Sequence, residues 1–135
     1  MSPPSFLSAS LYVAAGGALG SWLRLLAGRA WTLAIGPVAA SDFPWATLTV
    51  NVTGSFAMGL LAGWLARFGE HGEAWRLLLG VGVLGGFTTF SAFSLEVALL
   101  IERGTIGVAA FYVAVSLAAG FAGLFGGLAV MRAVA

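Results

Sequence analysis

The polar and aromatic residues from Gly85 to Glu96 are the strongest candidates for chemistry in this chain. The stretch reads Gly-Gly-Phe-Thr-Thr-Phe-Ser-Ala-Phe-Ser-Leu-Glu and lies at the end of a long uncharged segment. Its phenyl rings recur every third residue, so on a helix they form one stripe with hydroxyls beside it. The rings belong to Phe87, Phe90 and Phe93, and the hydroxyls to Thr88, Thr89, Ser91 and Ser94.

The glycine pair at the start of this stretch weakens the helix. Each glycine lowers helix stability by about 1 kcal/mol relative to alanine, so we expect a helix that is broken near its centre. Irregular backbone at membrane depth is tolerated only where protein or water surrounds it. The alternative interpretation is a helix-packing patch whose hydroxyls bond to their own backbone.

Two other segments add neutral polar groups. Asn51 is the only side-chain amide in the chain, and Thr47 lies one turn before it on the same helix face. Such an amide inside a span must be paired or hydrated, and an interhelical hydrogen bond is the alternative to a transport role. Tyr112 and Ser116 share a face of the last span, and Gly120 continues that face without a side chain.

These groups suit an anion. Amide N–H and hydroxyl O–H groups donate hydrogen bonds, and phenyl rings have a positive edge. We therefore expect a pathway for a small, strongly hydrated anion, lined without intramembrane carboxylates. Glu96 lies one turn past Phe93 and is expected to reach the interface or form an ion pair. Arg24 is expected either to snorkel to the headgroups or to concentrate anions at a pore vestibule.

Membrane-spanning helices must position these residues. Hydrophobic residues make up 60% of the 135 residues and charged residues 8%, against roughly 25% charged in soluble domains. A span needs about 20 apolar residues, and no charge occurs in 1–23, 43–66, 77–95 or 104–131. We predict an all-α membrane protein with one unit, 1–135, and four spans, about 6–30, 44–67, 75–100 and 105–130.

Short motifs between and within the spans refine this organisation. Gly36, Pro37, Ser41 and Asp42 have turn chemistry, so we expect a loop there. Two Gly-x-x-x-Gly motifs, at 16–20 and 123–127, predict close helix approach.

Several function classes are excluded by what the spans lack. The sequence has no cysteine, no metal-ligand cluster and no Ser-His-Asp set within the membrane, so we do not expect an enzyme or a nucleic-acid-binding protein. A small multidrug-type transporter would have the right size, but it would use an acidic residue in the first span. Here the first acidic residue is Asp42, beyond that span.

Three segments of the sequence resemble the small fluoride channels of the Fluc (CrcB) family. They are Gly-Gly-Ala-Leu-Gly-Ser-Trp-Leu-Arg at 16–24, Thr-Leu-Thr-Val-Asn-Val-Thr-Gly-Ser-Phe at 47–56, and the Gly85–Glu96 stretch. The resemblance implies a passive fluoride-selective channel that exports fluoride across the bacterial inner membrane. It also implies an antiparallel, dual-topology homodimer with two separate pores along its interface.

The resemblance assigns roles to residues of this chain. Phe90 and Phe93 match the paired pore phenylalanines, Asn51 a pore-facing asparagine, and Arg24 a vestibule arginine. Hydroxyls that line the ion path are matched by Ser91, Tyr112 and Ser116, and we place Thr47 and Thr89 on the same path. The family also implies a structural sodium ion at the dimer centre, on backbone carbonyls that correspond to Gly85 and Thr88 of both subunits. Carbonyls freed by a helix break are plausible cation ligands.

The sequence departs from the family pattern at two positions. Ala92 stands where the family commonly has threonine, which removes one hydroxyl from the track. Gly120 stands where a small polar residue is common, which shortens the Tyr112–Ser116 face. Three alternatives stay open: an anion or weak-acid channel of other selectivity, a small multidrug-type dual-topology transporter, or a non-conducting membrane subunit.

The arginines predict no preferred orientation. The chain has no lysine. With four spans, Arg67, Arg76 and Arg132 lie on one side of the membrane, and Arg24, Arg29 and Arg103 on or near the other. Because the positive-inside bias is balanced, we expect insertion in both directions, as an antiparallel homodimer requires.

Overall fold

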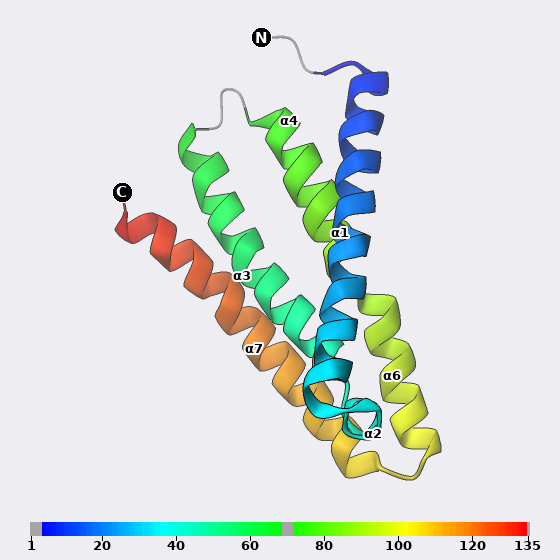
Figure 1. Ribbon diagram of the computed structural model, residues 1–135. Coiled ribbons are helices and arrows are strands. Elements are labelled where there is room, and N and C mark those ends of the chain that lie inside the picture. The colour runs from blue at the N-terminus through cyan, green and yellow to red at the C-terminus, as the bar shows by residue number, and fades with distance from the viewer. Residues whose placement is uncertain (1–3, 69–71, 135) are drawn as a thin grey trace.

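The computed structural model describes residues 4–68 and 72–134, and within them the fold is built from helices (Figure 1). They are α1 (Phe6–Ile35), α2 (Pro37–Asp42), α3 (Trp45–Phe68), α4 (Glu73–Trp75), η2 (Arg76–Leu84), α5 (Gly85–Phe87), α6 (Phe90–Glu102) and α7 (Ile106–Ala133). Four stretches are long and apolar enough to cross a membrane: Phe6–Ile35, Trp45–Arg67, Glu73–Glu102 and Ile106–Ala133. The predicted all-α class with four long apolar helices is confirmed.

The spans run alternately up and down. The start of α1, the end of α3, the start of α4 and the end of α7 lie at one end of the molecule, and the α6–α7 connection and α2 lie at the other (Figure 1). Helix α1 is capped at its start by Ser5, whose hydroxyl accepts from Ser8 N–H at 3.2 Å. It ends at Gly36, where a φ of 82° turns the chain out of the helix.

The loop predicted after the first span is wrong. Residues Pro37–Asp42 form a short helix, α2, between α1 and α3. Proline opens it, because its fixed φ suits the first helical position and its missing N–H would have no helical acceptor there. The turn residues of this segment therefore mark the two ends of a helix.

The third span consists of two helical parts joined by extended residues. Gly85 and Gly86 are helical, and α5 ends at Phe87. Thr88 (φ −83°, ψ 162°) and Thr89 (φ −156°, ψ 126°) are extended, and α6 begins at Phe90. The Thr89 hydroxyl accepts from Ala92 N–H at 3.2 Å and so caps the start of α6. Figure 1 shows that α6 is displaced sideways from the line of the preceding part of the span.

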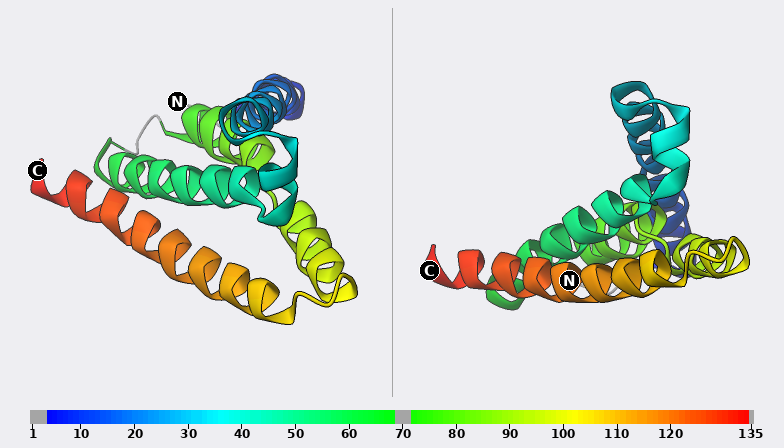
Figure 2. Two further views of the ribbon diagram at one scale, coloured as in Figure 1. Left: turned by 60° about the horizontal axis from the view of Figure 1, so that its bottom comes forward. Right: turned by 90° about the horizontal axis from the view of Figure 1, so that it is seen from below.

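Glycines bring two pairs of helices into close contact. A Cβ on Gly16 or Gly20 of α1 would collide with backbone atoms of η2, and a Cβ on Gly127 of α7 would collide with the Phe56 carbonyl of α3. Both predicted Gly-x-x-x-Gly contacts are thereby confirmed. The α1–η2 and α3–α7 pairs make the most extensive contacts of the fold (Figure 2), so the glycines fix which spans are neighbours.

The buried core is small for a chain of this length. Its members are Val50, Leu61, Leu100, Ala109 and Tyr112. Tyr112 is fully buried and joins α6 to α7 with Leu100 and Ala109. Many large apolar side chains on the outside are exposed, as expected where lipid or another subunit covers a helix. The internal contacts therefore position the third span and leave its Phe90 side uncovered.

Candidate functional site

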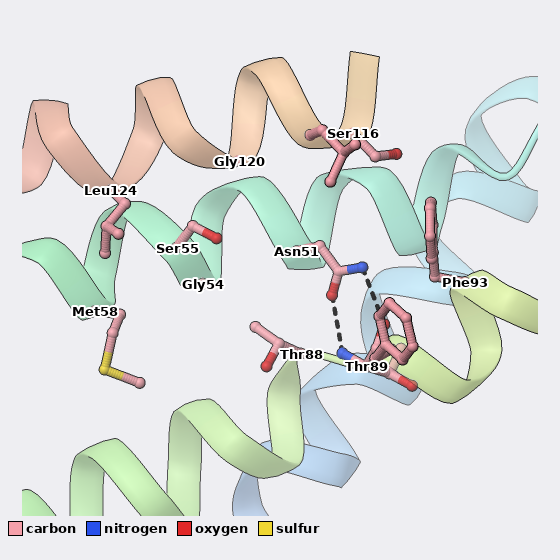
Figure 3. Close-up of a pocket in the computed structure, with 12 residues that line it drawn as sticks. Asn51, Gly54, Ser55, Met58, Thr88, Thr89, Phe93, Ser116, Gly120 and Leu124 are labelled. Atoms are coloured by element: carbon pink, nitrogen blue, oxygen red, sulfur yellow. Dashed lines mark hydrogen bonds between the residues drawn. The ribbon is translucent and has the colours of Figure 1, made fainter. Parts of the chain in front are cut away.

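Asn51 of α3 holds the extended part of the third span (Figure 3). Its Nδ2 donates to Thr89 O at 3.0 Å, and its Oδ1 accepts from Thr89 N–H at 2.8 Å. In a continuous helix that N–H would bond to Gly85 O, so Asn51 replaces the acceptor that the end of the helix removes. The interhelical hydrogen bond weighed for Asn51 is therefore present, and the amide keeps a second N–H outside this pair.

A pocket opens beside the two hydrogen bonds that join Asn51 to Thr89, between α3, α7 and the third span (Figure 3). Its volume is about 330 Å³. The residues that line it are Asn51, Gly54, Ser55, Met58, Thr88, Thr89, Phe90, Phe93, Ser116, Leu117, Gly120 and Leu124. None of these twelve lining residues carries a charge. The structure thus brings together five of the predicted pathway residues: Asn51, Thr89, Phe90, Phe93 and Ser116.

Aromatic rings continue from the pocket towards the core. Phe90 and Phe93 lie 5.9 Å apart between ring centroids, and Phe93 and Tyr112 lie 5.1 Å apart. Phe93 packs against the buried Tyr112 cluster, whereas Phe90 is 80% exposed. The Phe93 ring is therefore held by packing within the subunit, and the Phe90 ring projects from it.

The Glu96 carboxylate accepts two side-chain hydrogen bonds, one at each oxygen. Its Oε1 accepts from Thr47 Oγ1 at 2.6 Å and its Oε2 accepts from Tyr112 OH at 2.8 Å. Thr47 is only 7% exposed and Tyr112 is fully buried. Two hydroxyls predicted to line an anion pathway thus donate to a carboxylate, whereas the sequence predicted a pathway without carboxylates.

The hydroxyls of the third span divide into two kinds. Thr88 Oγ1 donates to Leu84 O at 2.8 Å and Ser94 Oγ donates to Phe90 O at 2.9 Å. These two follow the helix-packing interpretation. Thr89 Oγ1 and Ser91 Oγ lie 3.3 Å apart and face each other, with Ser91 exposed. Only the second pair is placed to offer a hydroxyl proton to a further acceptor.

Ser116 contributes a buried hydroxyl that has no hydrogen-bond partner among the described residues. An unpaired hydroxyl in a protein interior is costly, so a group in the pocket would be stabilised by bonding to it. Gly120, one turn further along α7, leaves open space, and the nearest atom to a Cβ added there is Ser55 Oγ at 3.8 Å. Ser55 therefore supplies a hydroxyl close to the position where Gly120 lacks one.

Ser55 and the contacts of Glu96 are the features that sequence reasoning missed. Ser55 lies four residues after Asn51, so helical spacing places both on one face of α3. Gly54, beside it, lies against Thr88, since a Cβ there would collide with the Thr88 methyl group. Helical spacing was thus a usable signal for Ser55. The partners of Glu96 lie 49 and 16 residues away in sequence, and no local pattern indicates them.

Arg24 points at the extended segment. Its Nη1 donates to Thr88 O at 3.3 Å, so the guanidinium lies beside the middle of the third span. This hydrogen bond to a backbone carbonyl was not predicted: the sequence suggested for Arg24 either a headgroup contact or a vestibule position. The arginine places a positive charge next to the residues that line the pocket.

Two backbone carbonyls at this segment are candidates for holding a cation. Thr89 N–H bonds to Asn51 and not to Gly85 O, which leaves the Gly85 carbonyl without its helical donor. Thr88 lies in extended backbone, and its carbonyl accepts from Arg24. Carbonyl oxygens suit hard cations, so both positions fit an alkali ion in donor type.

The chain is similar to known proteins over nearly its whole length. The family model "CrcB-like protein, Camphor Resistance (CrcB)" matches residues 11–128. A protein of Novosphingobium aromaticivorans named "Fluoride-specific ion channel FluC" is 61% identical over 129 residues, which cover 96% of this chain and all of the relative. Proteins of the same name from Rhodospirillum centenum and Caulobacter vibrioides are 57% and 53% identical, over 90% and 92% of this chain and 94% and 95% of their own lengths. The chain belongs to the CrcB-like protein family.

Proposed function

We propose that this protein is a passive fluoride-selective ion channel that exports fluoride across the bacterial inner membrane. The relatives named above are called fluoride-specific ion channels. The observation that carries the proposal is the uncharged pocket in which amide, hydroxyl and phenyl groups converge beside the extended Thr88–Thr89 segment. The four apolar helices supply the membrane passage that a channel needs.

The twelve residues that line the pocket offer an anion hydrogen bonds without carrying a charge themselves, and the charge of Arg24 lies beside them at Thr88. Ser116 has a hydroxyl proton without a partner among the described residues, and Asn51 retains one N–H beyond the bond to Thr89. The Thr89–Ser91 pair shares one hydrogen bond and leaves one further hydroxyl proton at the edge of the pocket. The rings of Phe90 and Phe93 add positive edges. Conduction requires binding that is favourable enough to admit the ion and weak enough to release it. Neutral donors satisfy both conditions better than an arginine in the path.

The Glu96 cluster sets the other end of the proposed path. Thr47 and Tyr112 each donate to one carboxylate oxygen, so in this arrangement their protons are not available to fluoride. We propose that Thr47 and Tyr112 hold the Glu96 carboxylate and stabilise its charge with two hydrogen bonds. Fluoride would approach Tyr112 along the Phe93 ring and leave the pore on the far side of the Glu96 cluster.

An antiparallel homodimer is the assembly we propose. In a lone subunit, exposed Phe90 and Ser91 and the extended backbone before them would face lipid. Irregular backbone facing lipid is strongly unfavourable, and a second copy packed on this face removes that cost. The balanced arginines allow both orientations. Each interface would then hold two pores, one along each copy of the pocket.

We also place a structural sodium ion at the centre of that dimer. Gly85 and Thr88 of each subunit would hold it through their backbone carbonyls, at the point where the third span is broken. When bound, such an ion joins the two subunits electrostatically. The support is the donor type of the two carbonyls, together with the exposure of Gly85 and of Phe90 in the same span.

The second candidate is a proton-coupled small multidrug-type transporter, and the observation in its favour is Glu96. A carboxylate inside a span is the group such a transporter would use. Its hydrogen bonds to Thr47 and Tyr112 argue for a structural carboxylate instead. The two functions differ in their dependence on a proton gradient.

Fluoride efflux from liposomes tests the proposal. Purified protein is reconstituted in liposomes loaded with equal potassium fluoride and potassium chloride, valinomycin lets potassium leave with the anions, and both anions are followed outside with electrodes. We expect rapid fluoride release that is independent of a pH gradient, and chloride release at the rate of empty liposomes. Equal release of both anions would favour a channel of other selectivity, and release only with a pH gradient would favour the transporter.

A further inference from the structure

The position of Arg24 is fixed by the packing of α1. Gly20, one turn earlier, lies so close to the third span that a Cβ there would collide with Val83 O. Because α1 approaches this closely, the Arg24 side chain reaches the end of α5 and donates to Thr88 O at 3.3 Å. The contact is part-buried and joins segments 64 residues apart in sequence.

The acceptor of this bond is one of the two carbonyls proposed to hold sodium. An arginine side chain stays protonated under all ordinary conditions, so a positive charge of the chain itself already contacts Thr88 O. Gly85 O differs, because its helical donor, Thr89 N–H, bonds to Asn51. The two carbonyls therefore differ: Gly85 O has lost its helical donor, and Thr88 O already accepts a hydrogen bond from Arg24.

We propose that Arg24 is a positioning residue that competes with an alkali cation for the Thr88 carbonyl and thereby sets the affinity of the cation site. The inference rests on the proposed function, since the sodium site is part of it. Two unit charges about 5 Å apart, screened as in bulk water, weaken each other's binding about fourfold, and partial burial increases the effect. Arg24 leaves the carbonyl when the site is filled and returns when it is empty.

Thermal unfolding measured against sodium concentration tests this. The full chain, its Arg24→Gln variant and its Arg29→Gln variant are purified and titrated with Na+, with N-methyl-D-glucamine replacing it at constant ionic strength. Tryptophan fluorescence, from the five tryptophans, gives the unfolding midpoint, which rises as a bound ion stabilises the fold. Glutamine keeps an N–H donor without the charge. Arg29 is an exposed arginine of the same helix, so Arg29→Gln controls for charge alone.

We expect Arg24→Gln to reach half-maximal stabilisation at an Na+ concentration at least about fourfold lower than the wild type, with Arg29→Gln unchanged. Equal concentrations for the wild type and Arg24→Gln would overturn the proposal, as would an equal shift in Arg29→Gln. An unfolding midpoint independent of Na+ in all three proteins would also overturn it. If the wild type then still passes fluoride in liposomes, the proposed function stands and only the coupling is lost.

A measurement on the wild type alone covers the case in which Arg24→Gln does not fold. Phenylglyoxal modifies accessible guanidinium groups, and peptide mass spectrometry reads each arginine separately. We expect the labelling of Arg24 to rise with Na+ at constant ionic strength while that of Arg29 stays level. Arg24 labelling that does not change with Na+ would overturn the proposal.

Discussion

Replacing Asn51 by leucine tests whether this side chain supports the extended segment. Leucine is similar in size but offers neither a donor nor an acceptor, so Thr89 N–H and Thr89 O both lose their partner. A part-buried backbone group left without a hydrogen bond costs about 1 to 3 kcal/mol. We therefore expect Asn51→Leu to lower the free energy of unfolding by about 2 to 6 kcal/mol and to abolish fluoride efflux.

Two further variants separate the hydrogen bonds from other effects. Asn51→Asp keeps an acceptor for Thr89 N–H but places a carboxylate oxygen against Thr89 O, so a loss of stability is expected from this side of the pair alone. Thr53→Val is the matched control, because Thr53 Oγ1 bonds to Thr49 O of its own helix at 2.7 Å and, within the described residues, to no other span. Denaturant titration in detergent micelles gives the free energies. An Asn51→Leu protein as stable as Thr53→Val would refute the idea that Asn51 holds the extended segment.

Three further predictions follow from the rings, the glycines and the arginines. Phe90→Ile and Phe93→Ile should leave the protein folded and reduce fluoride efflux at least about tenfold, because isoleucine lacks a positive ring edge; unchanged efflux would show that the rings only pack. Gly127→Ala should destabilise the protein by about 1 to 3 kcal/mol through its collision with Phe56 O. Gly17→Ala, where the added Cβ meets no described residue within 4 Å, should have little effect; equal unfolding midpoints for Gly127→Ala and Gly17→Ala would contradict the α3–α7 contact. A reporter fused to the carboxyl terminus should be detected on both sides of the membrane, and added lysines at one end should restrict it to one side; a single side in the unmodified protein would exclude dual topology.

The spacing of charges predicted the four apolar helices, because a charged side chain inside a span is too costly to be frequent. Glycine spacing likewise predicted the close contacts of Gly16, Gly20 and Gly127. The details of the third span were harder to predict. Local propensity pointed to Gly85 and Gly86 as the weak place, yet both are helical and the extended backbone falls at Thr88 and Thr89.

Contacts between residues far apart in sequence explain why the extended backbone lies at Thr88 and Thr89 and not at the glycines. Asn51, 38 residues away in sequence, supplies both hydrogen bonds that Thr89 needs outside a helix. The same holds for Glu96, whose surroundings depend on Thr47 and Tyr112. Local sequence patterns carry helical periodicity but not the identity of the side chain that another span places opposite. Five of the predicted residues therefore line one pocket, and the hydrogen-bond partners of Asn51 and Glu96 could not be predicted from local sequence.

The reversal potential of single channels tests the central claim most directly. The protein is inserted in a planar bilayer with a tenfold gradient of fluoride and a chloride gradient of the opposite direction. A fluoride-selective passive channel carries zero current at the fluoride equilibrium potential, about 59 mV for a tenfold gradient of a monovalent ion. A reversal potential near zero, or one at the chloride equilibrium potential, would contradict fluoride selectivity.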